Sequence, residues 1–284
     1  MIAPLLIALR EGLEASLIVG IVLSYLRKTN QMRYQRYAWA GVLAAIAVSV
    51  LVALGIQAIG AELEGRAEEI FEGVMMLIAV AVLTWMIFWM RSQARTLKGS
   101  LETELAAVRT SPRGLFSVTF FAVVREGVEM ALLLAATAFT VNGQETLIGS
   151  LIGLAVAALI GALVYASSIR LNLRHFFSVT SVLLLLFAAG MFASALHEFQ
   201  EAGLLPTIIE QVWDTNGLLA VESPLGSLLK TLFGYNSTPS LVDVIGYAAY
   251  WLFALTVMPW LIDRSLKAKA QADTVPAPFT PTTA

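Results

Sequence analysis

The sequence predicts an all-α integral membrane protein with seven transmembrane helices. Of its 284 residues, 58% are hydrophobic and 13% are charged, whereas a soluble domain usually carries about 25% charged residues. The surplus apolar surface requires lipid around it. Stretches long enough to cross about 30 Å of hydrocarbon occur at 2–25, 38–60, 70–90, 114–141, 146–168, 176–198 and 241–262.

These stretches are expected to form a single transmembrane domain over residues 1–264. The tail 265–284 is rich in Ala, Pro and Thr, a composition typical of disorder. The first stretch has no basic residues before its apolar run, so it is expected to stay as a helix and not to be a cleaved signal. Cysteine is absent, which excludes disulfides and thiolate chemistry. The net charge of −2 gives no indication of a nucleic-acid partner.

The distribution of basic residues predicts the orientation of the chain. Loops 26–37, 91–113 and 169–175, together with the C-terminal tail, hold 14 of the 18 Lys and Arg residues. These segments lie on the same side of a seven-helix chain, and Lys and Arg mark the cytoplasmic side. The N-terminus is therefore expected outside and the C-terminus in the cytoplasm.

The opposite loops carry acidic residues. Two interpretations stay open: the usual scarcity of Lys and Arg outside the cell, or an anionic vestibule that concentrates cations. The acidic residues concerned are Glu62, Glu64, Glu68, Glu69, Glu145, Glu201, Glu210, Asp214 and Glu222.

A charged pentapeptide occurs twice. Residues 10–14 read Arg-Glu-Gly-Leu-Glu, and residues 125–129 read Arg-Glu-Gly-Val-Glu, 115 residues later. The first lies in a helix that runs inward and the second in a helix that runs outward. Helices 1–3 (about 1–95) and helices 4–6 (about 110–200) are therefore expected to form an inverted repeat, with helix 7 outside it. Transporters with this organisation place the substrate site near the midplane, where the repeats meet.

Both pentapeptides, REGxE, are expected near the middle of the bilayer. Each ionisable group there costs roughly 2.5–3.5 kcal/mol, and residues i, i+1 and i+4 lie within about 100° on one helix face. Together the two faces offer four carboxylates and two guanidiniums, a formal charge of −2 that suits a cation. The residues are Glu11, Glu14, Glu126 and Glu129, with Arg10 and Arg125 balancing the charge.

The alternative is that each Arg only neutralises one Glu and holds helices together, but this leaves two carboxylates without partners. Glycines at positions 12 and 127 let neighbouring helices approach closely at this level. Carboxylate oxygens favour hard or borderline cations such as Fe³⁺, Mn²⁺, Mg²⁺, Ca²⁺ and Fe²⁺.

The doubled REGxE motif in a seven-helix chain resembles the oxidase-dependent iron transporter family, which comprises fungal high-affinity iron permeases and bacterial EfeU-type permeases. The resemblance covers Met1 to about Arg264, and the short chain is similar to the bacterial branch. It implies import of iron (Fe²⁺ or Fe³⁺) as substrate, with no separate cofactor. It also implies that the REGxE glutamates handle the metal, and that the protein lies in the bacterial inner membrane.

Two outer groups form a candidate outer capture site. Glu68, Glu69 and Glu72 open helix 3, where acidic residues also complement the helix dipole. His197 and Glu198 lie at the outer end of helix 6, where they are either ligands or interfacial polar residues. An HExxH zinc site is excluded because position 201 is Glu.

The outer loop 199–240 contains the apolar pieces LLPTIIEQVW and PLGSLLKTLF. They are expected to lie in the membrane interface or to dock an extracytoplasmic partner that binds or oxidises iron. The competing function is proton-coupled transport of another divalent cation or an organic solute through the same carboxylates. An enzyme is disfavoured because no nucleophile or metalloprotease motif is present.

The predicted orientation can be tested by cysteine labelling, since the chain has no native cysteine. In Glu64→Cys and Glu210→Cys, the new thiol should react with a membrane-impermeant reagent added outside the cell. In Arg95→Cys it should not. The opposite pattern would overturn both the topology and the inverted repeat.

Overall fold

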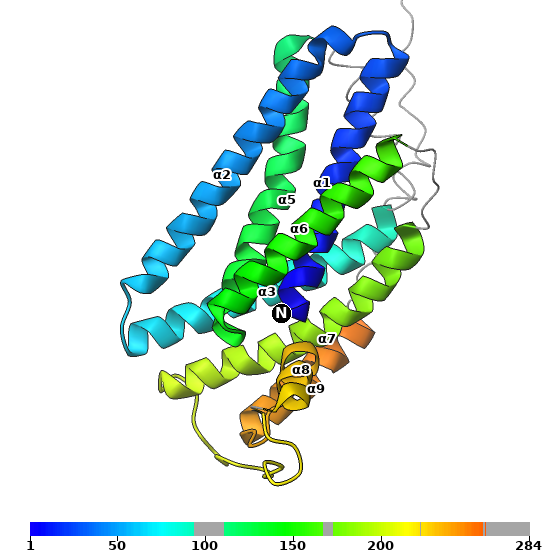
Figure 1. Ribbon diagram of the computed structural model, residues 1–284. Helices are drawn as coiled ribbons and strands as arrows, with labels where there is room; N and C mark the ends of the chain where they lie inside the picture. Colours follow the sequence, from blue (N-terminus) through cyan, green and yellow to red (C-terminus); the bar gives the residue numbers. More distant parts are fainter. Residues whose placement is uncertain (94–110, 167–172, 222, 258, 260–284) are drawn as a thin grey trace, which may run out of the picture.

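The protein is built from long helices packed side by side or across one another (Figure 1). A computed structural model describes residues 1–93, 111–166, 173–221, 223–257 and 259. The helices are α1 (Ile2–Lys28), α2 (Gln35–Ala61), α3 (Arg66–Gln93), α5 (Pro112–Thr140), α6 (Gly143–Ala166), α7 (Leu173–Glu201), α8 (Pro224–Phe233) and α9 (Leu241–Leu252). A 3-10 turn, η1 (Met32–Tyr34), precedes α2, and a π-helical turn, η2 (Phe253–Val257), continues α9.

A helix is found in each of the seven predicted stretches. By length and composition, four described helical segments can cross a membrane: Met32–Ala61, Arg66–Phe88, Gly143–Tyr165 and His175–Glu201. Helices α1 and α5 are of similar length to these four segments, at 27 and 29 residues, but each carries a REGxE motif. Those charges lower the hydropathy of both helices. Helix α9 with η2 forms a shorter apolar segment, and the predicted tail 265–284 lies outside the described residues.

The helices pack in a small set of pairs. Helix α1 packs mainly against α6, α2 against α5, and α3 against α7, while α1 also contacts α5 directly. In Figure 1, α3 and α7 run obliquely to the other four long helices. Helices α8 and α9 pack on α7 at the end of the molecule where α7 finishes.

Small residues let two of these pairs approach closely. Helix α6 faces α1 with Gly149, Gly153, Ala157 and Gly161, spaced four residues apart. A Cβ added to Gly153 would lie 2.5 Å from the Leu5 carbonyl oxygen and 2.9 Å from the Leu9 nitrogen. Such small-residue stripes are typical of helix contacts in membranes, where packing and not water exclusion drives association.

The α2–α5 pair uses the same packing register as the α6–α1 pair. Gly149 lies against Met1 and Leu5, and Gly41 lies against Phe116 and Phe120. Phe116 and Phe120 come 115 residues after Met1 and Leu5 in the chain. The two motif glycines follow the same rule. Gly12 faces Ala157, and Gly127 faces Ser49, with 2.8 Å between an added Cβ and the facing Cβ in each case.

The apolar piece PLGSLLKTLF of the outer loop forms α8, whereas LLPTIIEQVW forms no regular helix. The Ser223 hydroxyl caps α8 by accepting a hydrogen bond from the Gly226 nitrogen. The helix ends at Gly234, which has a φ of 67° and lies directly against Gly190 of α7. Glycine suits Gly234 for its backbone angle, and Gly190 leaves room for the contact. The outer loop is thereby held on α7.

The close packing of α1 and α6 predicts a steric effect at Gly153. Gly153→Ala should destabilise the protein by about 1–3 kcal/mol, because its Cβ would meet Leu5 and Leu9 backbone atoms that cannot rotate away. Gly55→Ala, at a glycine with nothing within 4 Å, is the matched control and should be neutral or slightly stabilising. Thermal unfolding in detergent would measure both, and equal melting temperatures would contradict the packing.

Candidate metal site where α1 meets α5

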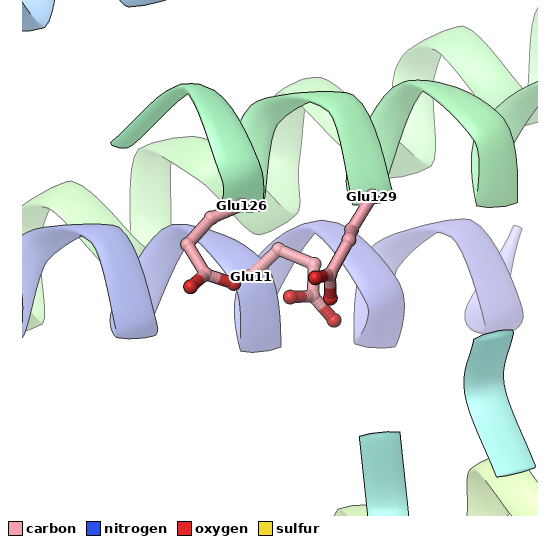
Figure 2. Close-up of side chains that lie close together, drawn as sticks. All are labelled: Glu11, Glu126 and Glu129. Carbon is pink, nitrogen blue, oxygen red and sulfur yellow. The ribbon is translucent and has the colours of Figure 1, made fainter. Parts of the chain in front are cut away.

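The contact between α1 and α5 brings the two REGxE motifs together. Figure 2 shows Glu11 projecting from α1 toward Glu126 and Glu129 of α5. One ligand oxygen from each of these residues lies within 4.8 Å of the others. Among the described residues, these three are the acidic side chains that lie close enough together to hold a metal ion. Glu11 is fully buried and Glu126 is 4% exposed. We call these three residues the carboxylate trio.

The trio is poorly satisfied by the protein itself. Among the described residues, neither oxygen of Glu11 has a hydrogen-bond partner, and Glu126 and Glu129 each have one oxygen without one. Burying a polar group without such a partner is costly. A bound cation would supply the missing interactions. Glu11 can therefore bind a positively charged ion without breaking a hydrogen bond to the protein.

Each motif arginine holds the last glutamate of its own motif. Arg10 Nε lies 3.2 Å from Glu14 Oε1, and Arg125 Nε lies 3.0 Å from Glu129 Oε1. Arg125 also lies 3.8 Å from Glu126. These i, i+4 pairs limit the net negative charge of the site and fix the direction in which both terminal glutamates point.

The two motifs are not used equally. Glu129 belongs to the trio, but its counterpart Glu14 does not, although Glu14 is within electrostatic range of Glu129. The arginines differ more strongly, since the Arg10 side chain is fully buried and that of Arg125 is 44% exposed. A cavity of about 560 Å³ lies at this exposed side, lined by Ala81, Val82, Trp85, Met86, Arg125 and Glu129.

The outer capture residues lie at neighbouring helix ends without forming a compact ligand group. Glu68 and Glu69 lie in the first turn of α3, with Glu72 following, and His197 and Glu198 lie near the end of α7. The two ends are adjacent, because a Cβ on Gly73 would lie 2.8 Å from the Phe199 ring. Among the described residues, the side chains close enough together to hold a metal ion are those of the trio, and the outer capture residues are not among them.

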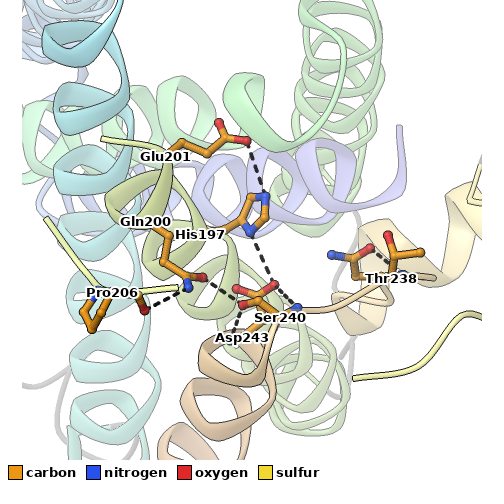
Figure 3. Close-up of polar contacts among 8 residues, drawn as sticks. His197, Gln200, Glu201, Pro206, Thr238, Ser240 and Asp243 are labelled. Carbon is orange, nitrogen blue, oxygen red and sulfur yellow. Dashed lines mark hydrogen bonds and ion pairs between the residues drawn. The ribbon is translucent and has the colours of Figure 1, made fainter. Parts of the chain in front are cut away.

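Sequence reasoning missed Asp243, which joins α9 to this outer region. His197 Nδ1 lies 3.4 Å from Asp243 Oδ2, and His197 Nε2 lies 3.5 Å from Glu201 Oε1. Figure 3 shows His197 between the two carboxylates. Asp243 is 6% exposed, and its Oδ1 has no hydrogen-bond partner among the described residues.

The same network fixes the start of α9. The Ser240 hydroxyl accepts from the Asp243 nitrogen at 3.1 Å and donates to Gln200 Oε1 at 2.8 Å, and the Ser240 nitrogen donates to Asp243 Oδ2 at 3.0 Å. The Ser-x-x-Asp spacing is a recognisable helix start in the sequence. Its contact with His197 depends on how α9 packs on α7, which the spacing does not indicate.

Comparison with known proteins identifies the family. The model of the iron permease FTR1 family matches residues 1–266. This chain belongs to that family. It is 40% identical over 276 residues to the ferrous iron permease EfeU of Shigella sonnei (strain Ss046), covering 96% of this chain and 98% of the relative. It is 36% identical over 276 residues to EfeU of Yersinia pestis, with the same coverage.

A third relative, EfeU of Escherichia coli O6:K15:H31 (strain 536 / UPEC), is 40% identical over 259 residues, or 90% of this chain and 94% of the relative. No solved structure matches the chain. The resemblance to iron permeases seen in the sequence is thereby confirmed over the whole chain. With its long apolar helices, this member of the family is a multi-pass membrane protein.

The unsatisfied burial of Glu11 predicts opposite effects on stability and metal binding. Metal-free Glu11→Gln should be more stable than the parent by about 1–3 kcal/mol, because the uncharged amide can donate to Glu126 or Glu129. The same variant should lose the stabilisation that Fe²⁺ or Mn²⁺ gives the parent. Thermal unfolding in detergent, with and without metal, measures both effects.

Glu145→Gln is the matched control, because Glu145 is exposed and pairs with the N-terminal amine at 2.8 Å. This control should change the stability by less than about 1 kcal/mol and should keep the response to metal. A Glu11→Gln variant that is destabilised yet still stabilised by metal would show that Glu11 is structural.

Proposed function

We propose that this permease imports iron into the cytoplasm through a midplane site formed by its two REGxE motifs. The observation that carries the proposal is the carboxylate trio, in which two helices far apart in sequence present two buried carboxylates and one partly exposed carboxylate within 4.8 Å. Glu14, the corresponding glutamate of the first motif, is proposed to join the ligand set when the metal is bound, although it lies outside the trio in this structure.

Charge balance supports a divalent cargo. The two motifs contribute four glutamates and two arginines, a formal charge of −2, which one Fe²⁺ ion neutralises. Two relatives that cover 96% of this chain are named ferrous iron permeases. Carboxylate ligands accept this borderline ion, and an inside-negative potential favours its inward movement by about 2.3 kcal/mol per charge per 100 mV.

We further propose that helices α1–α3 and α5–α7 form the inverted repeat, with α9 as the seventh membrane helix. The packing of the α6–α1 and α2–α5 pairs supports the repeat. The residues of α5 that contact Gly41 come 115 positions after the residues that contact Gly149 at the start of α1, and the two motifs differ by the same 115 positions. The basic loops then face the cytoplasm of a bacterial inner membrane. The carboxylate trio lies where the two repeats meet, as in other transporters of this organisation.

The outer side of the molecule is proposed to collect iron. Glu68, Glu69, Glu72, His197 and Glu198 together form the outer capture site and raise the local cation concentration. The adjacent outer loop is proposed to dock an extracytoplasmic protein that supplies iron. Its exposed apolar side chains support this role, since Leu218 is 91% exposed and Leu225 is 61% exposed.

The function can be tested by uptake of labelled Fe²⁺ into proteoliposomes. Glu129→Gln should reduce the uptake rate by more than about tenfold, because it removes one ligand oxygen and one opposing charge. Arg10→Lys should also fail, since a compact ammonium cannot hold Glu14 as a guanidinium does. Glu210→Gln, a substitution on the outer loop, is the control and should keep parental uptake. Near-normal uptake by the double variant Glu14→Gln, Glu129→Gln at matched protein level would exclude the shared site.

A further inference from the structure

Two cavities of similar size lie on different sides of the carboxylate trio. The first, of about 560 Å³, is the cavity beside Arg125 described above, which we call the inner cavity. The second, of about 550 Å³, is called the outer cavity, and among the residues lining it are Met76, Met191, Ser194, His197, Glu198 and Asp243.

The cavities lie at different levels along α3. The outer cavity is lined by the last turns of α7 and by α8 and α9. Met76 of α3 lines the outer cavity, whereas the inner cavity is lined by residues 81–86 of α3, about 8–15 Å further along the helix at about 1.5 Å per residue. Since the start of α3 packs beside the end of α7, residues 81–86 lie toward the other face.

Of these two cavities, the inner one reaches the trio. Glu129 belongs to the trio and also lines the inner cavity, and the neighbouring Arg125 side chain is 44% exposed there. A charged side chain within the membrane faces the bundle interior or a water-filled cavity, because hydrocarbon does not solvate it. Water in the inner cavity would therefore wet one side of the metal site.

An apolar layer separates the trio from the outer cavity. Ile7 lies one helical turn before Glu11, and Leu133 lies one turn after Glu129, both on the side toward the outer cavity. Both side chains are fully buried, in one core cluster with Met76 and Met191. Those two methionines also line the outer cavity, and no residue of the trio does. We call Ile7, Met76, Leu133 and Met191 the apolar seal.

We propose that the two cavities are the two halves of the iron path, and that this structure shows the permease with the trio open to the cytoplasm and sealed from outside. The proposal rests on the proposed function for its cargo and direction. In the outer cavity, His197, Glu198 and Asp243 bind a hydrated divalent cation before the seal opens. Asp243 suits this role because it is more than nine-tenths buried and keeps one oxygen without a partner among the described residues.

The seal must rearrange for a cation to pass. Methionine side chains are unbranched and flexible, so Met76 and Met191 can move without a large change in the helices. The fully buried Arg10 and the half-exposed Arg125 have different surroundings in this structure, although they occupy the same motif position. In the opposite state, Arg125 would be buried and Arg10 exposed, so that the inner cavity closes and the outer cavity opens toward the trio.

The proposal can be tested by cysteine accessibility, without iron and independently of transport. Single variants Ala81→Cys in the inner cavity and Ser194→Cys in the outer cavity are treated with a small charged methanethiosulfonate reagent in sealed vesicles of known orientation. Ala81→Cys should react at least about tenfold faster from the cytoplasmic side, and Ser194→Cys at least about tenfold faster from outside, because a charged reagent is excluded from hydrocarbon.

Leu51→Cys is the matched control, since Leu51 is 67% exposed on α2 and lines neither cavity. It should react from neither side, because its surroundings are lipid. An unreactive Ala81→Cys would show that the inner cavity contains lipid, and reaction from both sides would show that no seal exists. Either result overturns the proposal. Val82→Cys probes the same cavity if Ala81→Cys does not fold.

Because these reactions need no iron, their outcome is separate from that of the uptake experiment. If the glutamate variants keep normal iron uptake while the cysteines react as expected, the proposed iron site is wrong and the proposed path still stands. Normal glutamate-dependent uptake with the wrong accessibility pattern would contradict the path and not the cargo.

Discussion

The structure depends on two sets of opposite charges that meet where α1 crosses α5, of which Arg10, Glu11 and Glu126 are buried. Ion pairs of Arg10 with Glu14 and of Arg125 with Glu129 hold one carboxylate of each motif. The remaining glutamates, Glu11 and Glu126, stay buried with unsatisfied oxygens. Removing charges from water is costly, and pairing offsets it only when the geometry is good. The excess of carboxylate over guanidinium is therefore a cost that a bound cation would offset.

Close helix packing makes this charge arrangement possible. Gly12 and Gly127 bring α6 and α2 against the backs of the two motif helices, and both pairs share one register. Helices that approach this closely exclude both lipid and water from the site on those sides. Access is then confined to the faces covered by α3 and α7, which is where the two cavities lie.

The outer end of the molecule is organised by hydrogen bonds across α7 and α9 more than by apolar packing. Ser240 links the start of α9 to Gln200, and Asp243 lies beside His197. The chain between α7 and α9 folds back over α7, and the contact between Gly190 and Gly234 anchors it there. Polar side chains of three helices are in this way gathered around one cavity at the proposed iron-collecting side.

Local sequence patterns determined the positions of the long helices, the two REGxE motifs and the iron permease family. Hydrophobic length is a local property, and a doubled motif can be read directly from the chain. The choice of Glu11, Glu126 and Glu129 over Glu14 came only from the tertiary structure. So did the contact of Asp243 with His197 and the different exposure of Arg10 and Arg125. These features depend on how helices distant in sequence are rotated and tilted against each other. The hydropathy of a segment predicts that it is a membrane helix but does not give that rotation.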